Sequence, residues 1–130
     1  GDMTALPAIS VNLESLPDSA TGDAILLIRD VNDKQEIAKP AGMNIDWIVD
    51  ADLGANPLLL LDAARKIRAR DKLNYAWIAC EFEAMKLLRQ YLRVEENLGP
   101  DRLYISSYWK RGLVEDEHKQ AKRADAETDA

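Results

Sequence analysis

The side chains best suited to bind or react lie in two short segments, each after a run of strand-forming residues. Cys80 and Glu81 follow the apolar run 74–79, and the residues after the run 102–107 are Tyr108, Trp109, Lys110 and Arg111. Two strands joined by one helix lie parallel, with a right-handed crossover. Their carboxyl ends then meet at one edge of a sheet, where folds of this kind bind ligands.

The segment between these strands has the pattern of an amphipathic helix. Its apolar residues recur at steps of three and four, at Phe82, Met85, Leu88 and Leu92. Glu81 opens the predicted helix, where a negative charge complements the helix dipole. Asn97, Gly99 and Pro100 close it. We therefore predict one strand–helix–strand unit over residues 74–112.

Cys80 and Glu81 each admit more than one interpretation. The dipole of the following helix could lower the pKa of the Cys80 thiol and make it reactive; the alternative is a small buried hydrophobic residue. Glu81 and Glu83 bring two carboxylates to this strand end, but side chains two positions apart on a helix diverge. We therefore interpret Glu81 as a first-turn residue and not as half of a carboxylate pair.

The four residues after position 107 combine two aromatic rings with two cations. The rings of Tyr108 and Trp109 are suited to packing. The cations Lys110 and Arg111 are suited to pairing with phosphate or carboxylate groups. A structural role and a ligand-binding role therefore both stay open for this segment.

Composition limits the classes of function. A chain of 130 residues with 47% hydrophobic residues is long enough for one domain with its own core, and its formal net charge of −6 disfavours nucleic acid and anionic membrane as partners. One cysteine and one histidine provide neither a disulfide nor a metal cluster. We see no bilayer-spanning apolar run and no signal peptide, and expect a cytoplasmic protein. Because the first residue is Gly and not Met, we expect a cut, processed or partial product.

The remaining chain alternates helix and strand. Thr4 is a candidate helix cap before an apolar face formed by Leu6, Ile9, Leu13 and Leu16. Strands are predicted over 23–30 and 44–49, and a helix over 58–70 whose Arg and Lys residues we interpret as a solvated face. The loops between them are 31–43 and 50–57. This order predicts an α/β fold, with a mostly parallel sheet and helices on both faces.

The composition changes after Gly112, where the chain becomes charged and poor in large apolar residues. We predict an exposed helix over 114–124 and a frayed end over 127–130. His118 lies in this tail, with Lys122 four residues later. We therefore assign both side chains to a solvated helix face.

Three ordered motifs resemble those of the siderophore-interacting proteins, the flavin-dependent ferric-siderophore reductases. That family reads Tyr-x-Trp-x-Ala-Gly-Glu at a strand end, then Arg-x-Tyr/His-Leu-Arg in a helix, then Gly-Tyr-Trp-Arg/Lys-x-Gly. The matching residues are Tyr75, Trp77, Ala79 and Glu81, then Arg89, Tyr91, Leu92 and Arg93, then Tyr108, Trp109, Lys110 and Gly112. Cys80 and Ser107 replace two usual glycines. The first nine residues resemble the family's loop Gly-Asp-Glu-Thr-Ala-Leu-Pro-Ala-Ile, with Met3 in place of Glu.

The resemblance implies a ferredoxin-reductase-like domain that binds a nicotinamide nucleotide, here residues 1–112, followed by a charged helix and tail over 113–130. It implies that NADH or NADPH binds at the carboxyl edge of the sheet, and that hydride passes to FAD held by a separate barrel domain. Single electrons then reduce Fe(III) in a ferric siderophore. The cofactor contacts that it implies are Thr4, Ala5, Cys80, Glu81, Phe82, Tyr108 and Trp109.

The same resemblance places Cys80 opposite the nicotinamide ring, and Lys110 and Arg111 beside the basic pocket for an anionic siderophore. We assign no catalytic acid, base or nucleophile, because the cofactors carry the redox chemistry. The alternative is a non-catalytic nucleotide-binding or interaction module that has lost its flavin domain.

Two further expectations follow from the resemblance. The family has a strand before the N-terminal loop, near the middle of the sheet, so four strands here should leave a gap. Either the flanking strands close up, or another segment fills the gap, or the domain is poorly stable.

Asp50 and Asp52 follow the second predicted strand, at an edge where carboxylates would repel the 2′-phosphate of NADPH and so favour NADH.

Overall fold

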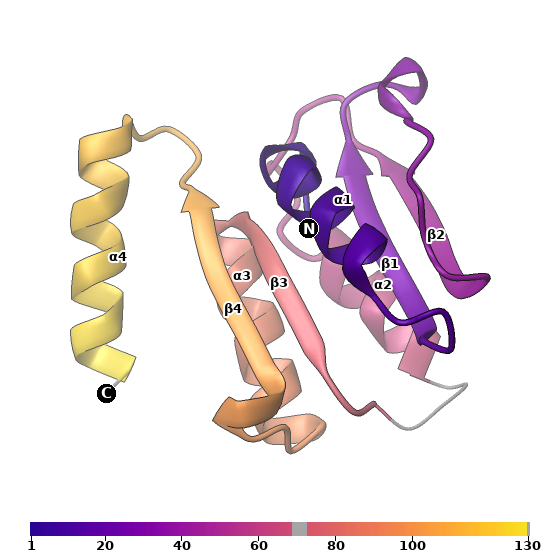
Figure 1. The fold of residues 1–130 in the computed structure, drawn as a ribbon. Coiled ribbons are helices and arrows are strands. Elements are labelled where there is room, and N and C mark those ends of the chain that lie inside the picture. The colour runs from indigo at the N-terminus through magenta and orange to yellow at the C-terminus, as the bar shows by residue number, and fades with distance from the viewer. Residues whose placement is uncertain (69–72, 130) are drawn as a thin grey trace.

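Helices and strands alternate along the chain in the computed structural model, which describes residues 1–68 and 73–129 (Figure 1). The strands are β1 (Thr21–Ile28), β2 (Gly42–Val49), β3 (Ala76–Glu81) and β4 (Leu103–Trp109). The α-helices are α1 (Leu6–Ser15), α2 (Leu59–Arg68), α3 (Phe82–Gln90) and α4 (Glu115–Asp129). Short 3-10 turns are η1 (Met3–Ala5), η2 (Val31–Asp33) and η4 (Pro100–Arg102), and α3 continues into one π-helical turn, η3 (Tyr91–Glu95).

The strands form two separate parallel pairs, β1 with β2 and β3 with β4. Residues Gly1 and Asp2 lie between the pairs at the carboxyl ends of the strands. The Gly1 ammonium donates to the Ile25 carbonyl at 2.9 Å, and the Leu27 N–H donates to the Gly1 carbonyl at 2.9 Å. On the other side, the Glu81 N–H donates to Asp2 Oδ2 at 3.0 Å. The expected gap is therefore present, and these two residues bridge one end of it.

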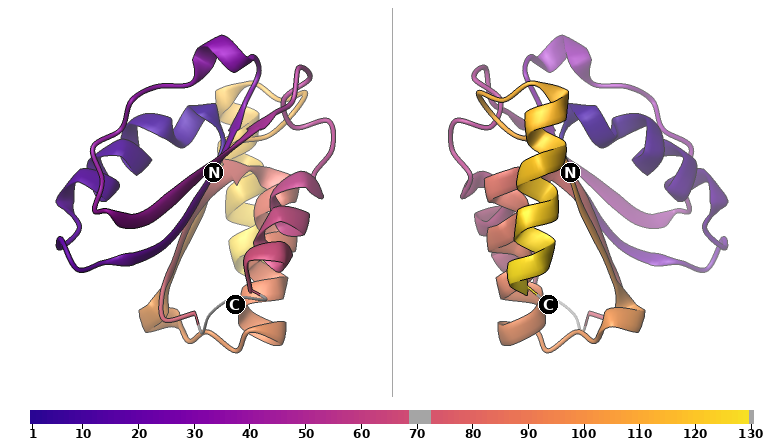
Figure 2. Two further views of the ribbon diagram at one scale, coloured as in Figure 1. Left: turned by 90° about the vertical axis from the view of Figure 1, so that its right-hand side faces the viewer. Right: turned by 90° about the vertical axis from the view of Figure 1, so that its left-hand side faces the viewer.

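Helices cover both faces of the divided sheet. Figure 2 shows α1 on one face and α2, α3 and α4 on the other. The larger apolar cluster lies under α2 and α3 and includes Leu60, Ile78, Phe82 and Leu88. The smaller cluster lies under α1 and includes Leu6, Ile9 and Leu26. The predicted α/β class, with parallel strands and helices on both faces, is confirmed.

Several predicted boundaries are wrong by a few residues. The runs 74–79 and 102–107 were expected to end before Glu81 and Trp109, but β3 and β4 extend to those residues, which pair with each other after a bulge at Cys80/Glu81. Asp2, and not Thr4, caps the first turn, because its side chain accepts from the Thr4 N–H. The predicted helix 58–70 is observed as α2, and its last two residues lie outside the described ranges.

The C-terminal helix is longer than predicted. A frayed end was expected from residue 127, but α4 continues to Asp129. Arg93 Nη1 lies 2.8 Å from Asp129 Oδ2, and this ion pair holds the last turn of α4 against η3, the continuation of α3. Among the described residues, no helix is both long and apolar enough to cross a membrane.

Because β3 borders the gap between the two strand pairs, we expect its backbone amides to be protected unequally from hydrogen exchange. The Glu81 N–H points to Asp2, so the alternation of a strand places the Trp77 N–H on the same, gap-facing side and the Ile78 N–H towards β4. We expect the Trp77 amide to exchange with solvent at least ~10-fold faster than the Ile78 amide, measured by NMR hydrogen exchange. Equal protection of the two amides would show that the gap side of β3 is paired.

Candidate functional site at the carboxyl edge of the sheet

The Asp2 carboxylate joins three segments at the carboxyl edge. Its side chain is buried, with 2% of its surface exposed. Oδ1 accepts hydrogen bonds from the N–H and the hydroxyl of Thr4. Oδ2 accepts from the Glu81 N–H at 3.0 Å and from Trp109 Nε1 at 2.8 Å. Asp2 therefore fixes η1 against the ends of β3 and β4.

Glu81 organises the same edge from β3. Its Oε2 accepts from the backbone N–H groups of Glu83 and Ala84 at 2.8 and 3.3 Å, which caps α3. Its Oε1 accepts from the Arg111 N–H at 3.2 Å and fixes the exit from β4. The interpretation of Glu81 as a residue that complements the start of the helix is confirmed, since its carboxylate serves α3 and does not pair with Glu83.

The loop after β2 packs against Trp109. Gly54 has a φ of +85°, and a Cβ at this position would lie 2.8 Å from the Trp109 ring. Only glycine combines this backbone conformation with so close an approach. The adjacent Leu53 is buried in the larger apolar cluster. The loop after β2 and the last residues of β3 and β4 therefore meet at Trp109.

Cys80 is a buried structural residue. Its side chain is fully buried, and burial, the largest cause, raises the pKa of its thiol to about 12. The hypothesis of a reactive thiolate at the start of the helix is wrong, because desolvation of the charged form outweighs any effect of the helix dipole. The alternative, a small buried hydrophobic residue, is confirmed.

The other predicted cofactor residues differ in accessibility. Thr4 is exposed, although its N–H and hydroxyl already donate to Asp2. Ala5 and Phe82 are buried beneath the edge. Tyr108 is half-buried, and burial, followed by the charge and hydrogen bond of Tyr104, raises its pKa. Ala5, Cys80 and Phe82 thus support the edge from below, where their side chains do not face solvent.

The two predicted substrate cations are already paired with carboxylates. Lys110 Nζ lies 3.5 Å from Glu83 Oε1 and 4.2 Å from the centroid of the Phe82 ring. Arg111 Nη2 lies 2.8 Å from Asp52 Oδ2 in an exposed ion pair. Exposed pairs of this kind are weak. An anionic ligand at this edge therefore competes with Glu83 and Asp52 for the two cations.

His118 and Ser107 are a buried pair that the sequence analysis missed. Ser107 Oγ and His118 Nε2 lie 2.7 Å apart, and both residues are buried. The prediction of a solvated face for His118 is wrong, because α4 turns this side chain towards β4. Lys122 is exposed, although it lies on the same face of α4, and its Nζ donates to Ser106 Oγ at 2.9 Å.

Within the described residues, no group of three or more His, Cys, Asp or Glu side chains could hold a metal ion. The edge instead gathers hydroxyl, aromatic and cationic groups. Lys110 and Arg111 supply donors that suit phosphate or carboxylate oxygens, Tyr108 and Trp109 supply rings beside them, and the Thr4 hydroxyl, which already donates to Asp2, can only accept. These groups fit a negatively charged, partly planar ligand such as a nucleotide.

Comparison with known proteins connects this edge to one family. The sequence profile described as "Siderophore-interacting protein" matches residues 1–112, which include η1, all four strands and the turn after β4. The chain belongs to the siderophore-interacting protein family. The resemblance recognised from the three motifs is thereby confirmed.

Individual proteins of known name are also similar to this chain in sequence or in structure. Ferric vibriobactin reductase ViuB of Vibrio cholerae is 35% identical over 123 residues, which are 92% of this chain and 45% of ViuB. The siderophore-interacting protein SipS from Aeromonas hydrophila superposes with a TM-score of 0.82 at 27% identity, over 98% of this chain and 50% of SipS. A siderophore utilization protein from T. fusca superposes at 0.75 with 27% identity, over 91% of this chain and 46% of its own. The chain thus spans about half the length of these proteins.

The contacts of Asp2 predict its contribution to stability. Asp2→Ala leaves the Glu81 N–H and Trp109 Nε1 without their acceptor, and each unsatisfied buried donor costs about 1–3 kcal/mol. We expect the free energy of unfolding in urea to fall by about 2–4 kcal/mol. Asp46→Ala, an exposed carboxylate on β2, is the matched control and should change it by less than about 0.5 kcal/mol. Equal effects of the two substitutions would contradict the role of Asp2.

Proposed function

We propose that this chain is the nicotinamide-nucleotide-binding part of a flavin-dependent ferric-siderophore reductase, which releases iron by reducing Fe(III) to Fe(II). The observation that carries the proposal is the family match over residues 1–112, which include the whole carboxyl edge. ViuB, whose name describes a ferric vibriobactin reductase, aligns with 92% of the chain. The proposal places the protein in the use of siderophore iron.

The residues of the carboxyl edge have separate roles in this proposal. Thr4, Tyr108 and Trp109 line the position of the coenzyme, while Ala5, Cys80, Glu81 and Phe82 shape the surface under it. Lys110 and Arg111 attract an anionic siderophore after they leave Glu83 and Asp52. When bound, a nicotinamide coenzyme and FAD supply a two-electron donor and its conversion to the single electrons that Fe(III) accepts. The residues of this chain bind and orient the coenzyme and supply positive charge for the siderophore.

The partner of this chain is then a flavin-binding barrel domain. The described part of the chain contains no metal cluster, and its buried cysteine is protonated at neutral pH because its pKa is about 12. A nicotinamide coenzyme delivers hydride and Fe(III) accepts one electron, and in this proposal the flavin makes that conversion. We propose a cytoplasmic site of action, where the reduced nicotinamide coenzymes are available.

NADH is the proposed coenzyme. Asp50 and Asp52 follow β2, and the Asp50 side chain accepts the Asp52 N–H at 3.2 Å, which fixes the turn. Arg111 neutralises part of the charge of Asp52. Within the described part of the chain the Asp50 carboxylate has no ion-pair partner, and it would disfavour a 2′-phosphate at this edge.

The test joins this chain to the flavin-binding half of a family member and follows two half-reactions by stopped flow. Flavin reduction by the coenzyme and flavin oxidation by a ferric siderophore are measured separately. We expect Lys110→Ala to weaken the second half-reaction at least ~10-fold and to change the first by less than about 2-fold, since the loss of one charge-assisted contact costs about 1.5–3 kcal/mol. NADH should have the higher kcat/KM.

Lys66→Ala removes another exposed lysine, on α2, and is the matched control that should leave both half-reactions unchanged. Equal losses in the two half-reactions with Lys110→Ala would assign Lys110 to the coenzyme or to the fold. No flavin reduction by either coenzyme in a folded protein would reject the proposed function in favour of a non-catalytic module. A higher kcat/KM with NADPH would reject only the coenzyme preference.

A further inference from the structure

Helix α4 is attached to the domain through one polar stripe. The residues of this stripe are His118, Lys122, Asp125 and Asp129, at steps of four, three and four, so they share one face of the helix. His118 is the only buried residue of the helix within the described chain. Ala121 adds one partly buried apolar side chain. Attachment of α4 therefore depends mainly on polar contacts and little on apolar burial.

The first half of α4 is attached by the pair of His118 and Ser107. The two side chains are 3% and 1% exposed, and Ser107 Oγ lies 2.7 Å from His118 Nε2. His118 Nδ1 is buried and has no hydrogen-bond partner among the described residues. A neutral ring tolerates one unpaired nitrogen, but a charged ring in this position would be poorly solvated. The geometry therefore favours the neutral form of His118.

Charges around His118 have both signs. Glu115 and Lys122 lie on α4, Glu81 approaches from β3, and Lys110 approaches from the turn after β4. Burial has the largest effect and lowers the pKa of His118 below its ordinary value of 6.5, with the two carboxylates and the two ammonium groups acting in opposite directions. Over residues 1–68 and 73–129, no carboxylate lies within hydrogen-bond distance of the ring to stabilise its charged form.

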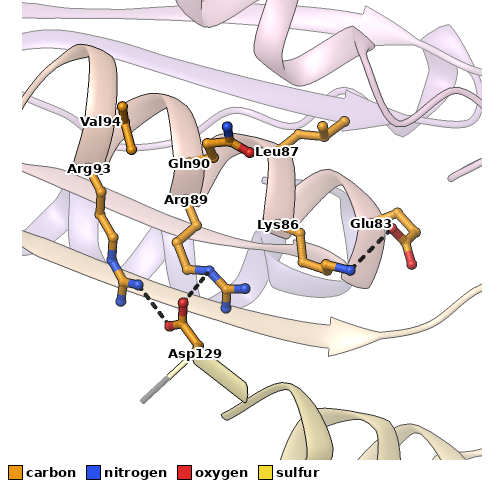
Figure 3. Close-up of a pocket in the computed structure, with 8 residues that line it drawn as sticks. All are labelled: Glu83, Lys86, Leu87, Arg89, Gln90, Arg93, Val94 and Asp129. Atoms are coloured by element: carbon orange, nitrogen blue, oxygen red, sulfur yellow. Dashed lines mark hydrogen bonds and ion pairs between the residues drawn. The ribbon is translucent and has the colours of Figure 1, made fainter. Parts of the chain in front are cut away.

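The second half of α4 is attached by ion pairs with α3. Arg89 donates from its two terminal nitrogens to both oxygens of Asp125, at 2.8 and 2.9 Å. Figure 3 shows Asp129 between Arg89 and Arg93, with Arg93 Nη1 at 2.8 Å from its Oδ2. The hydrogen bond from Arg89 is the main cause that lowers the pKa of Asp125 below its ordinary value of 3.8. The Arg89–Asp125 pair therefore stays charged at pH values above 3.8.

The attachment of α4 controls access to the edge strand β4. The sheet of β3 and β4 ends at β4, and α4 runs beside this strand (Figure 1). An uncovered edge strand presents unpaired backbone groups to other chains. If α4 separates from β4, Ser106, Ser107 and the outer side of β4 become accessible.

We propose that α4 is a two-part latch over the edge of β4, in which acid releases the His118–Ser107 contact and high salt loosens the Arg93–Asp129 contact, the more exposed of the ion pairs. This inference does not rest on the proposed function. The undocked helix exposes His118, which then takes up a proton at its ordinary pKa. The docked helix takes up this proton only at a lower pH. Docking is thus strongest above pH 6.5 and is lost as the pH falls from 6.5 towards the lower pKa of the docked state.

Amide hydrogen exchange on the 130-residue chain tests this latch. Protection factors, corrected for intrinsic exchange, are compared for α4 and for α3 as the internal reference. We expect α4 protection to fall by up to ~5-fold between about pH 6.5 and about pH 5.5, with α3 little changed, because the neutral fraction of the undocked ring falls from about one half to about one tenth. Raising NaCl from about 0.1 to about 1 M should lower α4 protection further at both pH values, since screening weakens the ion pairs.

Two variants separate the two parts of the latch. His118→Gln keeps an amide beside Ser107 but does not titrate, so α4 protection should lose its pH dependence. Arg93→Gln should remove most of the salt dependence, because Arg93 and Asp129 form the more exposed ion pair, and should keep the pH dependence. Any pH dependence left in His118→Gln comes from other groups, such as the Gly1 ammonium, whose pKa burial also lowers.

Three results would overturn the proposal. One is equal α4 protection at both pH values in the unsubstituted chain. Another is the same pH dependence in a folded His118→Gln variant. If that variant does not fold, NMR titration of the single histidine in the unsubstituted chain decides the matter. A pKa at or above 6.5 for His118 would show that docking does not favour its neutral form, whereas a lower pKa supports the latch.

Discussion

The Asp2 carboxylate accepts hydrogen bonds from η1, from the end of β3 and from the Trp109 ring at the end of β4. The strand pairs of this protein do not bond to each other directly within the described chain. Gly1 and Asp2 provide the backbone and side-chain bonds across the gap between them. The geometry of the candidate site, which is assembled from residues on both sides of that gap, therefore depends on one buried acceptor.

This dependence also explains why the site combines rigid and exchangeable parts. Asp2 and Glu81 are buried, and their oxygens accept from backbone or ring N–H groups, so the edge beneath a ligand is fixed. Lys110 and Arg111 lie above it in weak, partly exposed pairs. A charged ligand can take these cations without disturbing the carboxylates below. Such a division suits a domain that positions a cofactor and attracts an anionic substrate.

Local patterns in the sequence were enough to predict the strand–helix–strand unit. The apolar spacing from Phe82 to Leu92 is a short-range signal, and Glu81 at the start of a helix has a local electrostatic reason. The contacts of Asp2 could not be predicted in this way, because its partners Glu81 and Trp109 lie far away in the sequence. The family motif included Asp2 but carried no information about these partners.

His118 illustrates a different failure. Its neighbours Glu117 and Lys119 are charged and exposed, so the local composition indicates a solvated helix. The buried partner, Ser107, replaces a glycine that is usual in the family motif, and a serine there gave no indication of a histidine contact. For Cys80 the sequence left a reactive thiolate and a buried structural residue both open. The complete burial of Cys80 controls the pKa of its thiol and decides for the structural role, and this burial is a tertiary property.

The central claim is that Asp2 connects the strand ends across the gap, and a double-mutant cycle with Trp109 tests it most directly. Asp2→Ala, Trp109→Phe and the double variant are compared by urea unfolding. We expect a coupling energy of about 1–2 kcal/mol, because Trp109 Nε1 donates a hydrogen bond of 2.8 Å to the buried Asp2 carboxylate. Effects that add to within ~0.3 kcal/mol would contradict it.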